Sequence, residues 1–377
     1  MKDIFKKVID SVIGRVSAIL PSLTAAKTIN VLPVHDEFSY QLPENFDDLP
    51  ETVKRSYQVI VDSNPTLPTR HLYVYRDVLI SYQGAVFKNL SLSVKSLCHP
   101  ALVKEYSDSF LLKQWLVKPI HVPIGIKVAV VHDHNSTGNY YHWLIEACPR
   151  ILLLRKEERN CLLLVPAPTP EYIITTAALL GYNNLFPIKQ NEIIKAHTVL
   201  LAESVAEHKS FDLRHHDPEL LQELRASILR GLNISTVTPF RRIYVSRARQ
   251  KTRRLYNEDE FVKTIKKFGF EIVYFEHMSF KEQVYLMNET AILIGAHGAN
   301  LANALFMQPT TTLIEIVNKD IINSVYFRLT SYLKISYHAI IGIPDTQNVS
   351  NNSNLFVDIK KMHIFFKKIM VNFRTVV

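Results

Sequence analysis

The segment from residue 236 to residue 345 alternates short apolar runs with longer amphipathic runs, and this alternation constrains the fold more than any other feature of the sequence. Apolar runs of four to eight residues are typical of buried strands, and the longer runs have helical spacing. The expected strands are 242–246, 271–275, 291–295 and 312–317, and the expected helices are 257–269, 279–288 and 299–307. Strands and helices that alternate through short connections predict a parallel sheet with crossover helices, which is a Rossmann-like domain.

Local signals agree with this series. Asn257 with Glu260, and Ser279 with Glu282, have the spacing of capping boxes that begin helices, and Gly269 is placed to end the first of them. Agreement between local signals and the overall pattern is expected of a segment that folds to one structure.

A second series of the same kind precedes this one. Its expected strands are 127–131, 161–165 and 198–201, and its expected helices are 139–154, 171–180 and 217–232. Residues 71–92 instead alternate apolar and polar side chains, which predicts a small β-rich region. We therefore expect an α/β protein with two Rossmann-like domains.

Four segments are expected from these patterns. Residues 1–70 form an N-terminal extension with an amphipathic helix and an irregular, proline-rich stretch; 71–235 and 236–345 form the two α/β domains; 346–377 form a tail whose helix packs back on the N-terminal domain. The first helix is interpreted as packed on the protein, with an interfacial membrane helix as the alternative. No apolar run reaches the length of a membrane span.

The formal net charge of +9 favours anionic partners. Nucleic acid is not expected among them, because no zinc-finger, basic-zipper or ribonucleoprotein signature is present. Phosphate-bearing substrates and anionic lipid surfaces are therefore the anionic partners that we expect. Three scattered cysteines do not predict a disulfide framework or a zinc cluster, and we expect no metal site.

The C-terminal series carries three polar features where strands end. Gly295 and Gly298 flank His297 between a strand and a helix, so the backbone can approach an anion closely. The basic segment 246–254 follows another strand, and its arginines suit a pyrophosphate. Each feature alone has a structural alternative, a tight turn or a solvated loop. Together they predict a nucleoside-diphosphate site, because ligands bind beyond the carboxyl ends of parallel strands.

Glu315 is the third feature and lies near the end of the next strand. A carboxylate there could accept hydrogen bonds from a ribose diol. The alternative is a charged strand end that faces water.

The segment 138–150 is the candidate site of the N-terminal domain. On an α-helix, one face would carry Asn139, His142, Trp143, Glu146 and Arg150. We interpret Glu146 as a general base for an acceptor hydroxyl, with His142 as its partner or as the base itself. Trp143 would stack on a sugar ring. The alternative is a helix face packed between domains.

At these motifs the chain resembles glycosyltransferase family 61, often described as capsular polysaccharide biosynthesis proteins. The resemblance rests on Gly138-Asn-Tyr-Tyr-His-Trp-Leu-Ile-Glu146 with Pro149-Arg150, on Tyr244-Val-Ser-Arg247 with Arg253-Arg254, and on Ile294-Gly-Ala-His-Gly-Ala-Asn-Leu301 with Glu315. It covers about residues 70–345.

The resemblance implies a GT-B fold, in which two Rossmann-like domains face each other across a cleft, and an inverting hexosyl- or pentosyltransferase that needs no metal. The predicted catalytic residues are His142 and Glu146, and the predicted acceptor-binding residues are Asn139, Trp143 and Arg150. The predicted donor-binding residues are Ser246, Arg247, Arg253, Gly295, His297, Gly298, Ala299, Asn300 and Glu315.

A UDP-sugar is the expected donor, with no separate cofactor. A glycan or a lipid-linked oligosaccharide is the expected acceptor, in the synthesis of bacterial capsule or lipopolysaccharide O-antigen. The expected location is the cytoplasm, and the alternative is a peripheral location at the inner face of the membrane. The alternative function is a non-catalytic carbohydrate- or nucleotide-binding protein on the same fold. A Rossmann dehydrogenase is excluded by the lack of a Gly-X-Gly-X-X-Gly opening.

Overall fold

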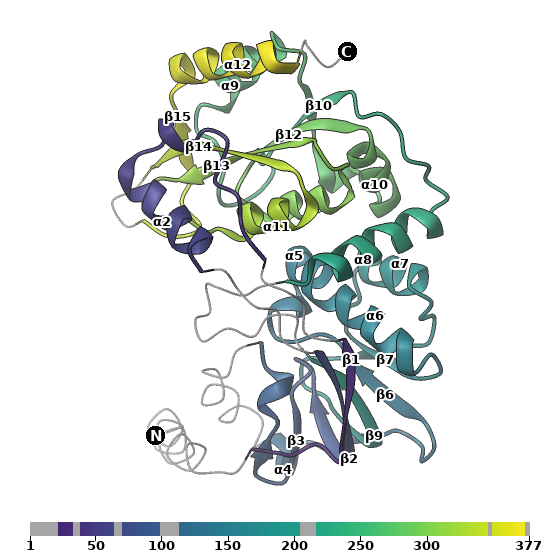
Figure 1. Ribbon diagram of the computed structural model, residues 1–377. Coiled ribbons are helices and arrows are strands. Elements are labelled where there is room, and N and C mark those ends of the chain that lie inside the picture. Colours follow the sequence, from purple (N-terminus) through teal and green to yellow (C-terminus); the bar gives the residue numbers. More distant parts are fainter. Residues whose placement is uncertain are drawn as a thin grey trace, which may run out of the picture. The chain divides into compact units, whose positions relative to one another are not determined.

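The computed structural model describes residues 22–32, 38–63, 70–98, 113–203, 216–345 and 349–373. The chain divides into two compact units, residues 1–36 with 66–231, and residues 37–65 with 232–377 (Figure 1). Residues 37–65 thus belong to the second unit, so the expected extension 1–70 is not one structural segment. The expected amphipathic helix near the N-terminus lies outside the described residues.

The first unit contains one mixed sheet in the order β4-β3-β2-β9-β6-β7-β8, with β1 on β2 and β5 on β9. The strands are β1 (Lys27–Leu32), β2 (Arg70–Ser81), β3 (Val86–Lys88), β4 (Ser91–Leu92), β5 (Ile120–His121), β6 (Lys127–Val130), β7 (Leu162–Pro166), β8 (Leu185–Ile188) and β9 (Ile193–Ala202). Strands β9, β6, β7 and β8 are parallel, whereas β2 pairs antiparallel with β9 from Leu72 to Ser81. The expected β-rich region 71–92 is therefore part of this sheet.

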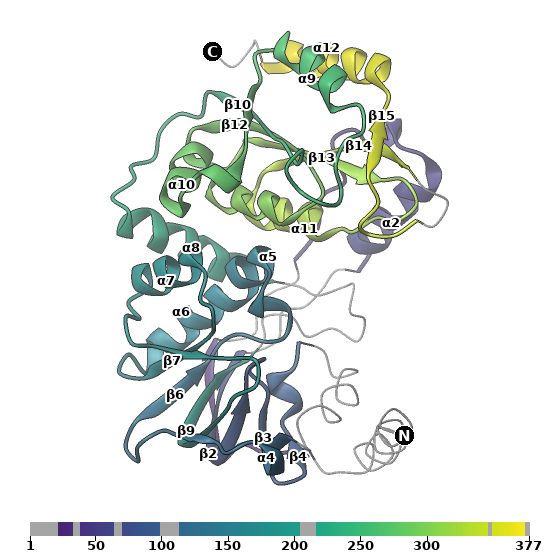
Figure 2. The ribbon, with the colours of Figure 1, turned by 180° about the vertical axis from the view of Figure 1, so that it is seen from behind.

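Helices pack beside this sheet (Figures 1 and 2). They are α4 (Lys113–Leu116), α5 (Tyr140–His142), α6 (Cys148–Glu157), α7 (Glu171–Leu179) and α8 (Pro218–Gly231), with short 3-10 turns η2 (Val94–Ser96) and η4 (Asn135–Thr137). Helix α6 contacts β9, α7 and α8. Between α5 and α6 the chain forms a π-helical turn, η5 (Trp143–Ala147). The expected helix 139–154 is therefore present, but its middle turn is wider than that of an α-helix.

The second unit contains a sheet in the order β11-β10-β12-β13-β14-β15. Its strands are β10 (Arg241–Val245), β11 (Glu271–Val273), β12 (Thr290–Ala296), β13 (Thr312–Asn318), β14 (Ser336–Pro344) and β15 (Leu355–Val357). The first five are parallel, and β15 is antiparallel to β14. Because the chain passes from β10 to β11 on one side and then to β12 on the other, the order reverses between β10 and β12. Ligands of open α/β sheets bind at such a reversal.

Helices cover both faces of this sheet, as its nearly continuous apolar strands require. Figures 1 and 2 show α9 (Glu258–Lys266) and α12 (Ile359–Phe373) together on one face, and α10 (Phe280–Asn288) and α11 (Val325–Leu333) on the other. The 3-10 helix η8 (Ala299–Phe306) contacts α10 and α11. The predicted α/β fold and the series of strands and helices over 242–317 are confirmed.

Two helix-start predictions have different outcomes. The Ser279–Glu282 capping box is present at α10. The Asn257 box is wrong, because the Asn257 side chain instead bonds both the carbonyl and the N–H of Val357, at 2.8 and 3.2 Å. Asn257 thereby attaches β15 to the start of α9.

The segments that flank the predicted series differ from expectation. Residues 51–61 form a helix, α2 (Glu51–Val61), preceded by the 3-10 turn η1 (Phe46–Asp48), where we expected irregular structure. Helix α12 packs on the second unit through Met362, Phe366 and Ile369, which share a core with Phe261 of α9. The prediction that the C-terminal helix packs on the N-terminal domain is therefore wrong. Within the described residues, no helix has the length and apolarity needed to cross a membrane.

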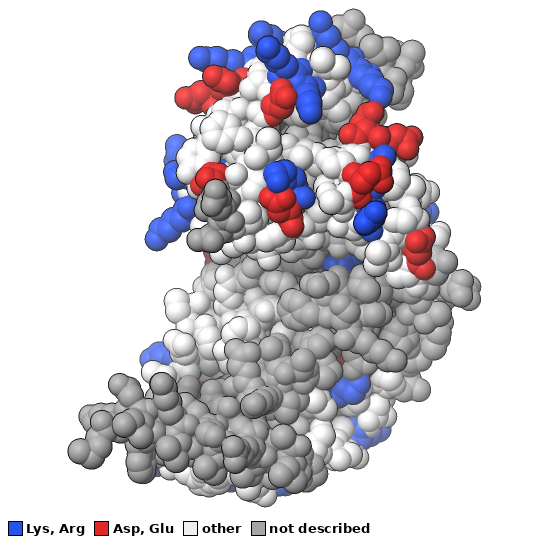
Figure 3. All heavy atoms as spheres, turned by 90° about the vertical axis from the view of Figure 1, so that its left-hand side faces the viewer, with Lys and Arg blue, Asp and Glu red and all other residues white. Residues whose placement is uncertain are grey.

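The basic surplus is partly located on the second unit. Exposed lysines lie on α9 and α12, namely Lys263, Lys266, Lys267, Lys360, Lys361, Lys367 and Lys368. Figure 3 shows Lys and Arg side chains mixed with Asp and Glu on one face of the molecule. Lys368, for example, pairs with Asp48 at 3.2 Å. This face therefore carries both signs of charge.

Candidate functional site

The first cluster of candidate residues lies where β10 and β12 end in the second unit. Val245 of β10 pairs with Gly295 of β12, so the loops that follow these strands start side by side. The Arg247 guanidinium lies on the α-carbon of Gly298: a Cβ atom there would be 2.0 Å from Nη1 of Arg247. A Cβ atom on Gly295 would be 2.7 Å from Leu301. Both predicted glycines are thus required by close packing inside the site.

Arg247 is held in a buried position. Its side chain is 7% exposed, and Nη2 donates to the carbonyl of Thr252 at 3.2 Å. Burial, with a further contribution from the charge of Arg253, lowers the pKa of Arg247 to about 10. A buried guanidinium next to a second cation is stabilised by an anion at this position.

Several buried N–H donors around these strand ends have no acceptor within the described part of the chain. They are Nε of Arg247, Nε of Arg253, Nδ2 of Asn300 and Nδ2 of Asn318. Buried polar groups are almost always hydrogen-bonded, so a group of unsatisfied donors indicates a ligand rich in acceptor oxygens. Arg253 and Asn318 also line a small pocket, together with His297, Asn323, Asn351 and Ser353.

His297 faces this pocket from the loop after β12. Its Nδ1 donates to Oε1 of Glu315 at 2.5 Å, and the hydroxyl of Tyr337 donates to Oε2 of the same carboxylate at 2.7 Å. Glu315 is 0% exposed. The expectation that Glu315 contacts a ribose is therefore wrong, because its oxygens are buried and bonded within the protein. Glu315 instead orients His297, and the second ring nitrogen, Nε2, is left for a ligand.

The other predicted donor residues divide into two groups. The Ser246 hydroxyl is buried and donates to Glu258 at 2.6 Å, so it fixes the loop and does not reach a ligand. The prediction that Ser246 binds the donor is therefore wrong. Ala299 and Asn300 are the first two residues of η8, beside Gly298, and are half-buried.

Within the basic segment 246–254, the side chain of Arg249 stacks on Tyr274, with 4.7 Å between the guanidinium carbon and the ring centroid.

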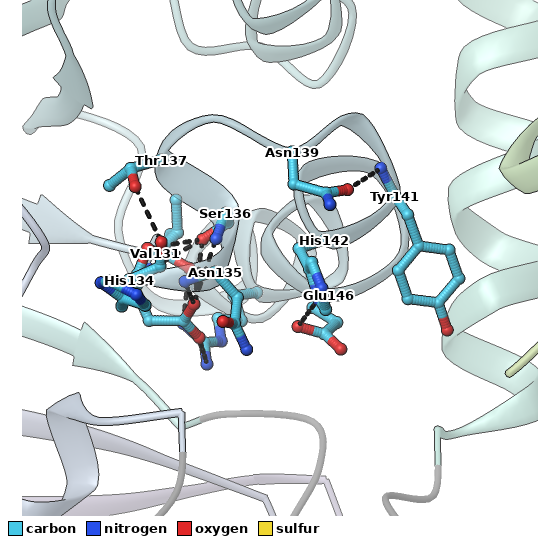
Figure 4. A network of polar contacts seen from close by, with 11 residues as sticks. Val131, His134, Asn135, Ser136, Thr137, Asn139, Tyr141, His142 and Glu146 are labelled. Carbon is cyan, nitrogen blue, oxygen red and sulfur yellow. Dashed lines mark hydrogen bonds and ion pairs between the residues drawn. The ribbon is translucent and has the colours of Figure 1, made fainter. Parts of the chain in front are cut away.

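The second cluster lies in the first unit, around the π-helical turn η5. Nδ1 of His142 and Oε2 of Glu146 are 2.8 Å apart, and Figure 4 shows the two side chains pointing toward each other. The His142 side chain is 19% exposed and that of Glu146 is 3% exposed. Single π turns inside α-helices are frequent at functional sites. The geometry is that of a base, His142, oriented by a buried carboxylate.

The neighbours predicted to bind an acceptor have structural roles. Trp143 is 0% exposed, and its Nε1 donates to Thr176 at 2.8 Å, so it cannot stack on a sugar. Arg150 is buried and donates to the carboxylate of Asp133 at 2.9 Å and to the carbonyl of Val131 at 2.7 Å. Both acceptor-binding predictions are wrong. Every residue of η5 is buried, and so is Arg150, so these side chains bond inside the protein and are not open to an acceptor.

Asn139 is exposed and begins α5, where its side chain accepts a hydrogen bond from the N–H of Tyr141 at 3.0 Å. The adjacent loop is ordered by Asp133, whose Oδ1 accepts from the backbone of Asn135 and Ser136 at 3.0 and 3.3 Å. Asp133 and Arg150 together therefore place the loop that leads to His142.

Sequence reasoning missed Asn318, Tyr337 and Asp133. Asn318 ends β13, and its place at the carboxyl end of a parallel strand was a usable signal. Tyr337 lies on a strand beyond the predicted series, and no sequence signal connects it to Glu315. Among the described residues, no three His, Cys, Asp or Glu side chains are grouped as metal ligands.

Comparison with known proteins gives one family match. Residues 140–314 match the family model described as Glycosyltransferase 61. This range contains His142 and Glu146 of the second cluster and Arg247, Arg253, His297 and Asn300 of the first, whereas Glu315 and Asn318 lie beyond its end.

Three individual proteins are similar over shorter stretches. Beta-1,2-xylosyltransferase RCN11 of Oryza sativa subsp. japonica is 32% identical over 143 residues, which is 35% of this chain and 25% of that protein. The EGF domain-specific O-linked N-acetylglucosamine transferase of Drosophila melanogaster is 35% identical over 97 residues, 24% of this chain and 18% of that protein. Alpha-1,3-arabinosyltransferase XAT3 of Oryza sativa subsp. japonica is 35% identical over 72 residues, 18% of this chain and 12% of that protein. The similarity thus spans a quarter of these proteins or less, and all three are named as sugar transferases.

Proposed function

We propose that this chain is a glycosyltransferase of family 61 that moves a sugar from a nucleoside-diphosphate donor to a hydroxyl of a glycan or lipid-linked acceptor. The observation that carries the proposal is the group of buried N–H donors without acceptors on Arg247, Arg253, Asn300 and Asn318. All four are donors, and a diphosphate supplies only acceptors. The match of residues 140–314 to the family model supports the same activity.

In the proposed reaction the acceptor oxygen attacks the anomeric carbon of the donor, and the bond from that carbon to the diphosphate breaks. The acceptor proton goes to Nε2 of His142, because Nδ1 of that ring is engaged by Glu146. Glu146 then stabilises the imidazolium that forms. The negative charge that develops on the diphosphate is stabilised by Arg247 and Arg253. A single displacement of this kind inverts the anomeric configuration.

This mechanism requires the two units to face each other across a cleft, the GT-B arrangement implied by the resemblance. Arginines in place of a metal and a UDP-sugar as donor are further parts of the proposal. The capsular or O-antigen product, the bacterial origin, the cytoplasmic location and the peripheral membrane contact stay predictions from the sequence.

A thermal-shift panel of nucleoside diphosphates and nucleotide sugars, with and without a chelator, tests the donor site. A ligand that binds only the folded state raises the melting temperature with its concentration. We expect one diphosphate to do so in the presence of chelator, and the Arg247→Ala variant to need at least tenfold more of it. A chain that responds to no nucleotide, and that transfers no sugar from any donor, would contradict the proposal and favour a non-catalytic binding protein.

A further inference from the structure

A chain of hydrogen bonds connects helix α2 to His297 through the interior of the second unit. The hydroxyl oxygens of Tyr57 on α2 and Tyr337 on β14 are 3.0 Å apart. Tyr337 donates to Oε2 of Glu315 at 2.7 Å, and Oε1 of Glu315 is 2.5 Å from Nδ1 of His297. Tyr57, Tyr337 and Glu315 are buried, and His297 at the end of the chain lines the pocket.

The direction of each hydrogen bond follows from the chemistry of the groups. A carboxylate only accepts, so Tyr337 and His297 both donate to Glu315. The single proton of Tyr337 is used there, and Tyr57 therefore donates to Tyr337. Burial raises the pKa of both tyrosines well above the usual value, so both hydroxyls keep their protons. With Nδ1 of His297 fixed as a donor, Nε2 is the ring nitrogen that faces the pocket.

We propose that Tyr57 and Tyr337 are positioning residues for donor binding: they fix the Glu315 carboxylate, which fixes the His297 ring so that Nε2, when the imidazole carries both protons, donates to a phosphate oxygen. This inference rests on the proposed function. It assigns α2, which lies in the chain between the two parts of the first unit, to the donor site of the second unit. Orientation matters because a phosphate contact depends on the placement of the donor nitrogen.

The surrounding aromatic side chains make the test specific. Phe327 packs against Tyr57 and Tyr337, with ring centroids 4.9 and 5.5 Å away. Replacement of either tyrosine by phenylalanine keeps this packing and removes only the hydroxyl. A matched control is available in the same cluster, because Tyr40 and Tyr332 also share a buried hydroxyl contact, at 2.5 Å, but neither bonds Glu315.

His297 is surrounded by few other titratable groups. Glu315 of β13 and Arg253 face it at the pocket, and Arg247 lies beyond Gly298. Tyr326 of α11 has its ring centroid 5.2 Å from that of His297. None of these is altered in the tyrosine variants, so a changed pH profile of binding would report on the Glu315–His297 pair.

The experiment uses the full chain and compares Tyr337→Phe, Tyr57→Phe and the control Tyr332→Phe. Calorimetry measures the affinity for UDP and for uridine across the pH range in which histidine titrates. Proton–nitrogen NMR of chain labelled at histidine follows the Nδ1–H signal, assigned by its loss in His297→Gln.

We expect Tyr337→Phe to weaken UDP binding about tenfold, the value of one net hydrogen bond, with uridine affinity unchanged. In the same variant, we expect the pH midpoint of UDP binding and the position of the His297 Nδ1–H signal to shift. Tyr57→Phe changes the same quantities in the same direction and by less, because Glu315 keeps its bond from Tyr337. Tyr332→Phe leaves all of them unchanged.

Each part of the argument can fail separately. Wild-type chain that binds no nucleoside diphosphate contradicts the proposed function, and the NMR signal still tests the positioning. Wild-type chain that binds UDP, with Tyr337→Phe and Tyr57→Phe matching it in affinity, pH midpoint and His297 signal, overturns the inference. An equal loss in Tyr332→Phe also overturns it, since general packing would then be the cause. If Tyr337→Phe does not fold, Tyr57→Phe decides the question.

Discussion

The guanidinium of Arg247 occupies the space that a side chain on Gly298 would need, with Nη1 only 2.0 Å from the position of a Cβ atom. The loop after β12 and the loop after β10 are therefore fitted to each other by the absence of a single methyl group. Gly298 has an extended backbone, with φ at 171°, so the glycine is required by this contact and not by its conformation.

Gly298→Ala should displace Arg247 and weaken the binding of nucleoside diphosphates. Because one charged hydrogen-bonding group is moved, we expect a loss of about 1.5–3 kcal/mol, or roughly ten- to a hundredfold in dissociation constant. Calorimetric titration with UDP measures it. The clashing atoms belong to the end of a flexible side chain that can move aside, so the melting temperature should fall only slightly.

Gly138→Ala is the matched control for this substitution. A Cβ atom on Gly138 meets nothing within 4 Å, and its φ of −149° lies outside the left-handed region. UDP affinity should be the same as in the wild type. Equal affinity in Gly298→Ala would show that Arg247 does not hold the diphosphate.

His142→Ala should abolish sugar transfer while it leaves donor binding intact. General-base catalysis contributes about 10²–10⁴-fold in rate, and Nε2 of His142 is the nitrogen that Glu146 leaves available. Turnover with donor and acceptor, and UDP affinity in parallel, separate the two effects.

Glu146→Gln tests the division of roles within this pair. The amide keeps the size of the side chain but does not stabilise an imidazolium, so the rate should fall less than in His142→Ala. If Glu146→Gln lost more activity than His142→Ala, Glu146 would be the base and His142 its partner.

The second unit was the more predictable part of the fold. Its strands β10, β12 and β13 are largely apolar because helices cover both faces, and short loops leave few alternatives for their connection. The positions of Arg247, His297 and Gly298 at strand ends followed from that pattern. Their mutual contact did not, since it depends on which strands are neighbours.

Other features depend on tertiary contacts that leave no local signal. Glu315 lies three residues before the end of β13, and the register pairs it with Ala339, which brings Tyr337 within reach on the neighbouring strand. Tyr57 lies in a segment read as irregular, yet it is fully buried against β14. Trp143 was expected to line a cleft, yet every residue of η5 is buried and the indole donates to Thr176 inside the first unit.

Trp143→Phe should lower stability without an effect on the chemistry. The substitution removes the hydrogen bond to Thr176 and leaves a small cavity, for a cost of about 1–3 kcal/mol. Denaturant unfolding measures this cost, and the rate of transfer by the folded variant should equal that of the wild type. A variant of unchanged stability that no longer transfers sugar would return Trp143 to the acceptor site.

Acid should destabilise the chain partly through His338 on β14, where burial lowers the pKa of the imidazole to about 4. The unfolded chain binds a proton at this residue below about pH 6.5, and the folded chain does so only near pH 4. Because the unfolded state holds more protons in that interval, the free energy of unfolding falls as the pH drops through it, by about 3.4 kcal/mol at most. His338→Gln should therefore flatten the pH dependence of the free energy of unfolding between those values, as urea titrations at a series of pH values would show.

His121→Gln, at an exposed residue of β5, is the control and should leave the slope of that pH dependence unchanged. A slope equal to that of the wild type in His338→Gln would assign the acid sensitivity to other groups, of which the buried His132 is the first candidate, because burial lowers its pKa as well.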